Sequence, residues 1–294
     1  MKKTLLAACI AVCFSAPAVQ ADPMTPEEEG LVLMDRAGET RMLTQRLLRR
    51  ACYIASGADL GLGDANSIGQ DLDRVTETLA ILQNGTDTLA AQRAPATVMA
   101  LRNLQPTWES YAIYARFAQR GSMHPAYLEN MAAVRPQVIE GLEDLVSSMS
   151  RTYGHGRFDP YSASAINTTA RLRMLSNLIS VEHCLLEQGT KAASETVLTQ
   201  AINRFRLDIA ALRSGDDSRR LAPPSDAMAI EFECVAARLG EVEEAIVVQN
   251  ASVAELRRHT RNLQQASDAA LKMLTSEILD APGPGASACD APAL

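Results

Sequence analysis

An internal repeat constrains the fold of this chain more than any other feature of its sequence. Residues 36–57 read RAGETRMLTQRLLRRACYIASG, and residues 168–189 read TTARLRMLSNLISVEHCLLEQG, 132 positions later. Unlike residue types recur at matching places, in the pairs Arg41 and Arg173, Met42 and Met174, Leu43 and Leu175, Cys52 and Cys184, and Gly57 and Gly189. A match of this kind at one offset predicts two copies of a unit of roughly 130 residues.

Each copy is predicted to be helical. Only 4% of the residues are aromatic, whereas Ala, Leu, Glu, Gln and Arg recur throughout, and this composition favours helices over sheets. Turn residues divide each copy into four helical stretches. These are residues 25–57, 66–84, 96–120 and 125–152 in the first copy, and 160–188, 191–213, 225–249 and 251–280 in the second. Pro106 and Pro136 are expected to kink or split their helices.

Four helices with short connections bury their apolar stripes most simply as an antiparallel bundle. We therefore predict an all-α chain of two tandem four-helix bundles, residues 22–155 and 156–280, packed together as an internal pseudo-dimer. Residues 281–294 are rich in Pro and Gly and are predicted to form a disordered tail.

The first 21 residues are predicted to be a cleaved signal peptide. Lys2 and Lys3 precede an apolar run over residues 5–14, and Val19-Gln20-Ala21 offers a small-residue cleavage site. An alternative is a lipoprotein cleavage box at Leu6-Ala7-Ala8-Cys9, although its apolar stretch is short. No later stretch approaches 18 uncharged apolar residues, so we expect a soluble, exported, periplasmic protein that does not itself span a membrane.

The charge balance excludes non-specific nucleic-acid binding. Without Lys2 and Lys3 the chain keeps 26 basic residues against 35 acidic ones, a formal charge of −9. Binding to the phosphate backbone needs a positive footprint that displaces counterions. Nucleic acid is therefore not an expected partner.

Arg41 is placed unusually on its predicted helix. On a helical wheel it falls in a sector roughly 60° wide that holds apolar and small residues, among them Ala37, Leu48 and Cys52. Arg173 repeats this placement in the second copy. A buried guanidinium needs a partner, because an unpaired buried charge costs several kcal/mol. That partner is either a carboxylate from a neighbouring helix or an exogenous anion, and the wheel leaves both open.

Arginine suits small oxyanions because its planar fork donates two parallel hydrogen bonds. Neutral side chains within about one helical turn of each arginine could add further donors. The candidate ligand-binding residues are Arg41, Thr44 and Gln45 in the first copy, and Arg173, Ser176 and Asn177 in the second.

Residues 37–46, AGETRMLTQR, resemble the opening helix motif of the PilJ-type domain, the sensor region at the N-terminus of type IV pili methyl-accepting chemotaxis transducers. A related motif marks the periplasmic domain of nitrate- and nitrite-responsive sensor kinases. The second copy keeps the motif at residues 173–176 but departs from it at Ala170, where the family has Gly, and at Leu178, where it has Arg.

The resemblance implies periplasmic four-helix bundles that bind a ligand without catalysis. In the nitrate-sensing relatives the motif arginine contacts the bound anion where the first helices of two subunits meet. By this resemblance Arg41 and Arg173 are the ligand residues, and the two copies would face one shared anion.

Four cysteines remain after the signal peptide, and they allow three pairings. Cys52 and Cys184 each lie eleven residues beyond their arginine, about 16 Å along a helix. If the two motif helices pack side by side and parallel, these two cysteines meet, and we favour this disulfide. The alternatives are that each is a small buried filler, or that Cys184 pairs with Cys234. Cys289, in the tail, is expected to be free.

No catalytic, cofactor or metal-binding constellation is found. Glu255 and His259 are spaced as two metal ligands could be, but no second such pair exists, and no nucleophile is paired with a base. We therefore predict a non-enzymatic sensor, with neither cofactor nor metal, that recognises a small anion such as nitrate or nitrite. It would relay the signal to a separate membrane-bound signalling protein.

The alternative function is a module that docks a type IV pilus or envelope component without any ligand. The surroundings of the two arginines discriminate between these functions. If Arg41 and Arg173 are each paired with a buried Asp or Glu of the same chain, docking is favoured, whereas ligand binding is favoured if they face an open cleft.

Overall fold

The structure, a computed structural model, describes residues 26–58, 64–153, 159–247 and 250–278. The described residues form helices and no strand, so the all-α prediction is confirmed. The helices are α1 (Pro26–Ala55), α2 (Asp64–Asn84), α3 (Pro95–Gln119), α4 (Pro125–Tyr153), α5 (Pro160–Glu187), α6 (Glu195–Ser214), α7 (Asp226–Val247) and α8 (Val253–Ile278), with a short 3-10 turn, η1 (Asp217–Arg219). The predicted signal peptide and tail lie outside the described residues.

The ends of the helices follow local signals. The predicted boundaries agree with the observed ones within four residues, and the largest difference is at the start of α6, where Ser194 caps the helix by accepting from the Val197 backbone N–H. The two repeat glycines end α1 and α5: Gly57 has φ +72° and Gly189 has φ +64°. This left-handed conformation is available to glycine at little cost, which explains why the repeat holds glycine at both places.

Pro106 and Pro136 do not split their helices, contrary to one of the two expected outcomes. Each lies inside a continuous helix, α3 or α4. Both prolines are exposed, so water can satisfy the carbonyl that loses its helical hydrogen bond. A proline on the solvent side of a long packed helix is therefore tolerated.

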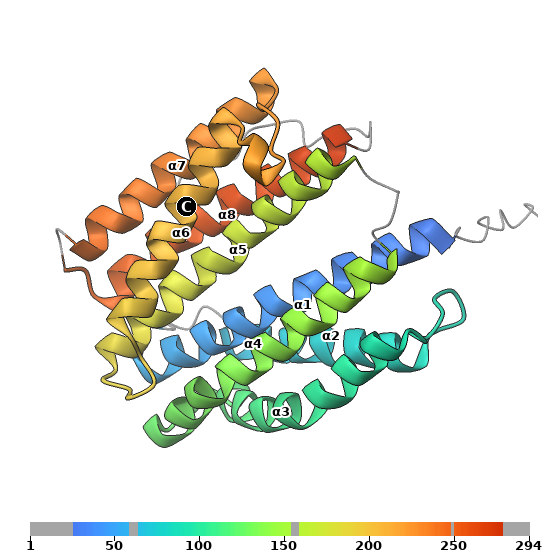
Figure 1. Ribbon diagram of the computed structural model, residues 1–294. Helices are drawn as coiled ribbons and strands as arrows, with labels where there is room; N and C mark the ends of the chain where they lie inside the picture. Colours follow the sequence, from blue (N-terminus) through green and yellow to red (C-terminus); the bar gives the residue numbers. More distant parts are fainter. Residues whose placement is uncertain (1–25, 59–63, 154–158, 248–249, 279–294) are drawn as a thin grey trace, which may run out of the picture.

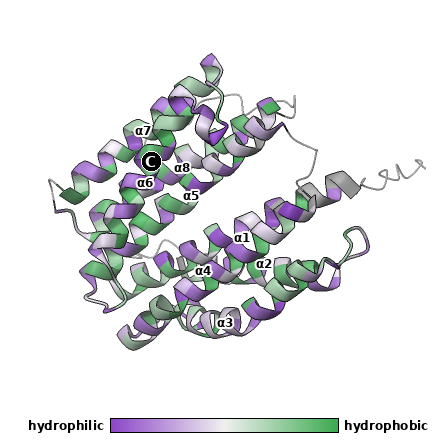
Figure 2. Cartoon of the chain, viewed as in Figure 1, coloured by the Kyte–Doolittle hydropathy of each residue, from purple (hydrophilic) through white to green (hydrophobic). Residues whose placement is uncertain are grey.

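The helices pack as two groups of four. Helices α1–α4 contact one another, helices α5–α8 contact one another, and α1 packs against α5 between the groups. Each group has its own apolar core, with Leu47 and Tyr111 fully buried in the first and Phe205 in the second. Apolar and polar residues alternate along every helix, as Figure 2 shows. This is the pattern of amphipathic helices that cover a shared core.

A disulfide joins the two groups. Cys52 at the end of α1 and Cys184 at the end of α5 are bonded, with their Cα atoms 6.2 Å apart. Equivalent residues of the two repeats therefore meet, and α1 and α5 run parallel, as Figure 1 shows. The Cys184–Cys234 alternative is excluded. Cys234 is itself disulfide-bonded, and Cys289 lies outside the described residues.

Further polar contacts between the groups gather near this disulfide. The Tyr53 hydroxyl lies 2.5 Å from the Ser180 hydroxyl, and Arg135 of α4 forms an ion pair with Glu182 of α5. We call this part of the molecule the closed end. In the described part of the chain, no hydrogen bond or ion pair joins the two groups N-terminal to Arg49 of α1. Figure 1 shows the ribbons of α1 and α5 diverging in this direction.

Candidate functional site

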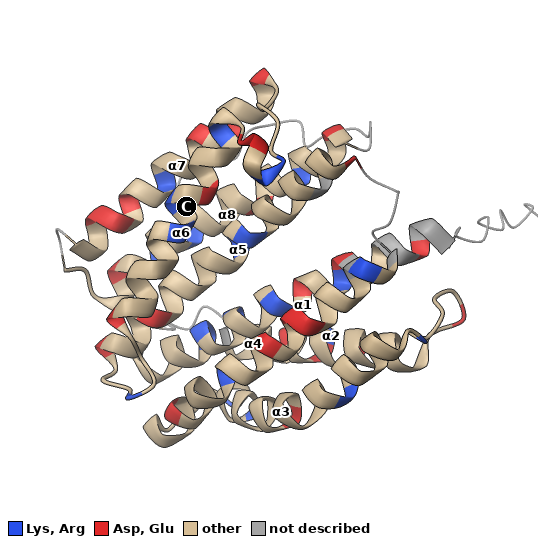
Figure 3. Ribbon diagram, viewed as in Figure 1, with Lys and Arg blue, Asp and Glu red and all other residues tan. Residues whose placement is uncertain are grey.

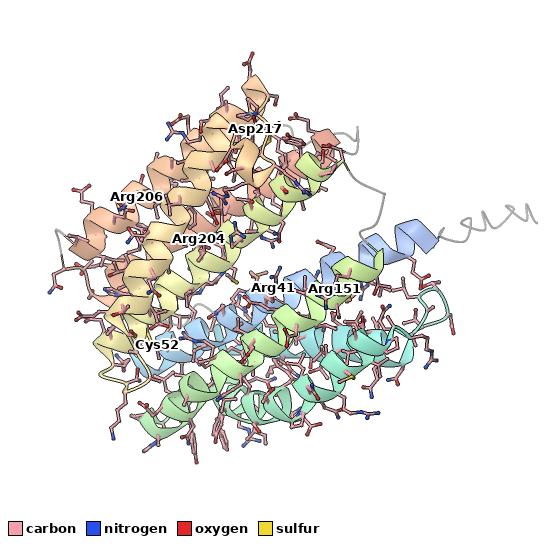
Figure 4. The ribbon with its side chains drawn as sticks, viewed as in Figure 1. Arg41, Cys52, Arg151, Arg204, Arg206 and Asp217 are labelled. Atoms are coloured by element: carbon pink, nitrogen blue, oxygen red, sulfur yellow. A yellow bond between two sulfur atoms is a disulfide. The ribbon has the colours of Figure 1, made fainter. Side chains whose placement is uncertain are left out.

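Arg41 is half-buried on α1 and has no hydrogen bond or ion pair with any described residue. Burial lowers the pKa of its guanidinium, the nearby Glu143 carboxylate opposes this effect, and the positive charge of Arg171 adds to it. Figure 4 labels Arg41 midway along α1, on the side of the diverging ribbons, and Cys52 at the closed end. Arg41 is therefore a partly desolvated cation that no described residue neutralises by direct contact.

Arg173 is placed differently, although it is the repeat equivalent of Arg41. Its Nε donates to a carboxylate oxygen of Asp268 on α8, and the two form an ion pair. The charge of Arg173 is therefore neutralised by a carboxylate of the second group of helices. The two arginines that share a wheel position do not share an environment.

Three of the four neutral candidates donate to their own helix. The Thr44 hydroxyl donates to the Thr40 carbonyl at 2.8 Å. In α5, the Ser176 hydroxyl and the Asn177 amide both donate to the Arg173 carbonyl, at 2.8 and 2.9 Å. Short polar side chains commonly bond back to the preceding turn of a helix. The donor groups of these three side chains are therefore already engaged within their own helices.

Gln45 and Asn177 carry buried amide oxygens without a partner in the described part of the chain. The exposed fractions of the two residues are 3% and 0%. They occupy equivalent repeat positions, seven residues before the paired cysteines, and two helical turns place them on the same faces of α1 and α5 as the disulfide. A buried polar group without a partner costs about 1–3 kcal/mol. One helical turn beyond Arg41, the α1–α5 interface therefore contains buried amide oxygens whose hydrogen-bonding capacity is not satisfied by described residues.

Arg171 is a further arginine near Arg41 that the sequence did not predict. Its Nε donates to Asp208 Oδ2 on α6 at 2.6 Å, and Asp208 is fully buried. Arg171 stands where the first copy has Glu39, which pairs with Arg74 of α2. This reversal of charge between otherwise matching positions was the signal available in the sequence.

Glu255, which is spaced with His259 as two metal ligands could be, has hydrogen-bond partners at the start of α8. The Glu255 carboxylate accepts from the Ser252 backbone N–H and hydroxyl, which lower its pKa, and so it caps α8. Ala251, Ala254 and Arg258 line a shallow hollow with these two residues. Among the described residues no group of three or more His, Cys, Asp or Glu side chains could hold a metal ion.

No described helix is both long enough and apolar enough to cross a membrane. Figure 3 shows charged residues spread along the helices of both groups, including basic residues on α1 and α5 where their ribbons diverge.

Comparison with known proteins identifies the second group of helices. Residues 160–273 match the PilJ family model, described as the N-terminal domain of type IV pili methyl-accepting chemotaxis transducers. This range runs from the start of α5 into the last part of α8, so this group of helices is similar to a PilJ domain. No curated protein and no solved structure matches the chain.

Proposed function

We propose that this protein is an extracytoplasmic sensory protein that binds a small oxyanion at Arg41, a proposal that proceeds from the PilJ-like domain at residues 160–273. PilJ domains belong to a sensory, non-catalytic family. The observation that carries the proposal is the desolvated guanidinium of Arg41, which no described carboxylate contacts. A bound anion would supply the missing opposite charge.

Nitrate and nitrite are the ligands we propose first. Both are planar oxyanions, and the planar fork of a guanidinium can donate to two of their oxygens at once. The resemblance of residues 37–46 to the motif of nitrate-sensing relatives supports the same choice. The protein would pass the signal to a separate membrane-bound signalling partner.

The position of the disulfide suggests how binding could be passed on. Arg41 lies eleven residues from Cys52 on α1, about 16 Å along the helix. The closed end fixes the two groups of helices to each other, whereas the stretch around Arg41 is not cross-linked. An anion bound there would change the separation of α1 and α5 while the closed end acts as the pivot.

A docking module remains the second candidate, favoured by one observation. Arg173, in the half that matches the PilJ model, is closed by Asp268 of its own chain. The second group could therefore serve as a binding surface for a pilus or envelope component with no ligand of its own. Binding of an anion by the intact protein decides between these functions.

Replacing Arg41 by methionine tests the proposal. Sodium nitrate and sodium nitrite are expected to raise the Tm of the wild-type protein, and at 100 times Kd a ligand stabilises by about 2.7 kcal/mol. R41M should show no anion-dependent shift beyond that given by sodium chloride at equal ionic strength. Without anion, R41M should be more stable than the wild type by about 1 kcal/mol, because the substitution removes an uncompensated charge. This difference in the free energy of unfolding corresponds to a Tm that is a few degrees higher.

The matched control is R173M, which changes the repeat-equivalent arginine and should keep the nitrate-dependent shift. An R41M protein that nitrate stabilises as strongly as the wild type would sink the anion proposal. If the wild-type protein shows no anion-specific shift at all, the docking function is the one supported.

Replacing Glu143 by glutamine is expected to tighten anion binding. Glu143 is exposed on α4, and its charge raises the pKa of Arg41, so it competes with an anion for the guanidinium. Exposed charge pairs are worth at most about 1 kcal/mol, so E143Q should lower the Kd for nitrate by about two- to five-fold. D144N removes an equally exposed carboxylate next to it and should leave the Kd unchanged. Equal effects of the two variants in calorimetric titrations would point to general electrostatics instead.

A further inference from the structure

We infer that Arg171 of α5 completes the Arg41 site from the second group of helices, so that one small oxyanion bridges α1 and α5. This inference rests on the proposed function and deepens it. It replaces the pairing of Arg41 with Arg173, which the repeat suggested, by a pairing of Arg41 with Arg171, whose repeat equivalent is the acidic Glu39. Three observations support it: the sides of α5 on which these residues lie, the anchoring of Arg171, and the charge around Arg41.

The first observation is the side of α5 from which each arginine projects. Arg171 lies eleven residues before Glu182, about three helical turns, and therefore on the same side of the helix. Glu182 pairs with Arg135 of α4, so this side of α5 faces the first group of helices near α4. Glu143, the carboxylate that acts on Arg41, belongs to α4 as well.

Arg173 is held by another neighbour. It lies seven residues, or two turns, before Ser180, whose hydroxyl contacts both Tyr53 of α1 and Thr260 of α8. Its ion pair with Asp268 is also on α8. Within the second group of helices, it is the positive charge of Arg171 that acts on Arg41 and lowers the pKa of its guanidinium. Arg41 and Arg171 thus lie on the α4 side of the α1–α5 interface.

The second observation is how Arg171 is held. Its Nε donates to Asp208, and no other polar contact of its guanidinium is found in the described part of the chain. The terminal Nη groups keep donors for a ligand while the Nε bond fixes the plane of the fork. A guanidinium anchored in this way is preorganised for an oxyanion, since little side-chain freedom is lost on binding.

The third observation is an excess of positive charge. Asp208 is shared by three arginines, because Arg204 and Arg219 also form ion pairs with it, at 3.2 and 2.6 Å. One carboxylate cannot neutralise three guanidiniums, so Arg171 retains much of its positive potential. Arg41 adds a further cation nearby without a contacting carboxylate. Two neighbouring like charges repel each other, and an anion between them removes this repulsion.

These features define the chemical class of the ligand. Two forks on different helices require acceptor oxygens that point in at least two directions, as in nitrate, nitrite or a small carboxylate. A halide offers charge without directed oxygens and would be bound more weakly. Because the arginines come from different groups of helices, the bound anion would connect α1 to α5 in the stretch that no described polar contact crosses.

Isothermal titration with sodium nitrate on the intact protein tests the inference. R171M is expected to raise the Kd at least ten-fold. The double variant R41M/R171M should bind no more weakly than R41M alone, because the two side chains act on one ion. R204M is the matched control, since Arg204 shares Asp208 but is 52% exposed, and it should bind nitrate within two-fold of the wild type.

Each outcome of this experiment assigns the site. If R41M loses nitrate binding while R171M binds as the wild type does, the role of Arg171 is overturned and the proposed function stands. If nitrate does not bind the wild-type protein, or R41M retains binding, both fail. If R171M does not fold by circular dichroism, R171K keeps the charge but loses the planar fork, and a weakening of at least ten-fold supports the inference while unchanged binding overturns it.

Discussion

Replacing both Cys52 and Cys184 by alanine is expected to lower the free energy of unfolding by about 5 kcal/mol, because the bridge closes a loop of the order of 100 residues or more. The cysteines are separated by 132 positions, and cross-linking them restricts the unfolded chain over that whole length. Both side chains are fully buried, and alanine removes only one sulfur atom at each place. Guanidinium denaturation of the C52A/C184A variant, without reductant, measures the difference.

Substitution is a cleaner test than reduction, because Cys234 is also disulfide-bonded and a reductant would act on it as well. The variant should keep its helical far-ultraviolet signal, since each group of helices has its own core. Without the bridge the two groups are expected to unfold in separate transitions. A midpoint equal to that of the wild type would mean that the bridge adds nothing to the packing at the closed end.

The sequence predicted much of the fold because the signals involved are local. Turn residues set the helix ends within four residues, and the repeat glycines Gly57 and Gly189 end α1 and α5 in the same conformation. The favoured Cys52–Cys184 pairing depended on only one tertiary assumption, that the two motif helices run parallel. The repeat alone left that assumption open, because a two-fold axis between copies of one unit can relate their helices in parallel or in antiparallel, and the structure shows the parallel arrangement.

The site was less predictable because it depends on what neighbouring helices carry. A helical wheel places Arg41 and Arg173 alike. Only Arg173 forms an ion pair with Asp268, which lies 95 residues later in the chain. The relation of Arg171 to Arg41 arises only from the way α5 meets the first group of helices. No periodicity within one helix contains this information.

The departures of the second repeat from the first are therefore informative. An exact pseudo-dimer would place the same arginine on both sides of the interface. In the second copy, Asp268 forms an ion pair with Arg173, and Arg171 occupies the position that Glu39 has in the first copy.

Replacing Arg135 by methionine is expected to destabilise the protein by about 3–5 kcal/mol, because it leaves a buried carboxylate without its partner. The side chains of Arg135 and Glu182 are 8% and 0% exposed, and they join α4 to α5 at the closed end. Glu182 also accepts from the Ser194 backbone N–H at 3.2 Å, which alone cannot compensate a full negative charge. Urea denaturation of R135M against the wild type measures this effect.

The double variant R135M/E182Q separates the loss of an ion pair from the cost of a stranded charge. Glutamine keeps an oxygen that can accept from Ser194, and the neutral pair should recover most of the lost stability, since a buried ion pair is often worth little more than a neutral replacement. R151M removes an exposed arginine from the same helix and should change stability by less than about 0.5 kcal/mol. If R135M and R135M/E182Q are equally destabilised, packing of the arginine stem, not the buried charge of Glu182, holds α4 against α5.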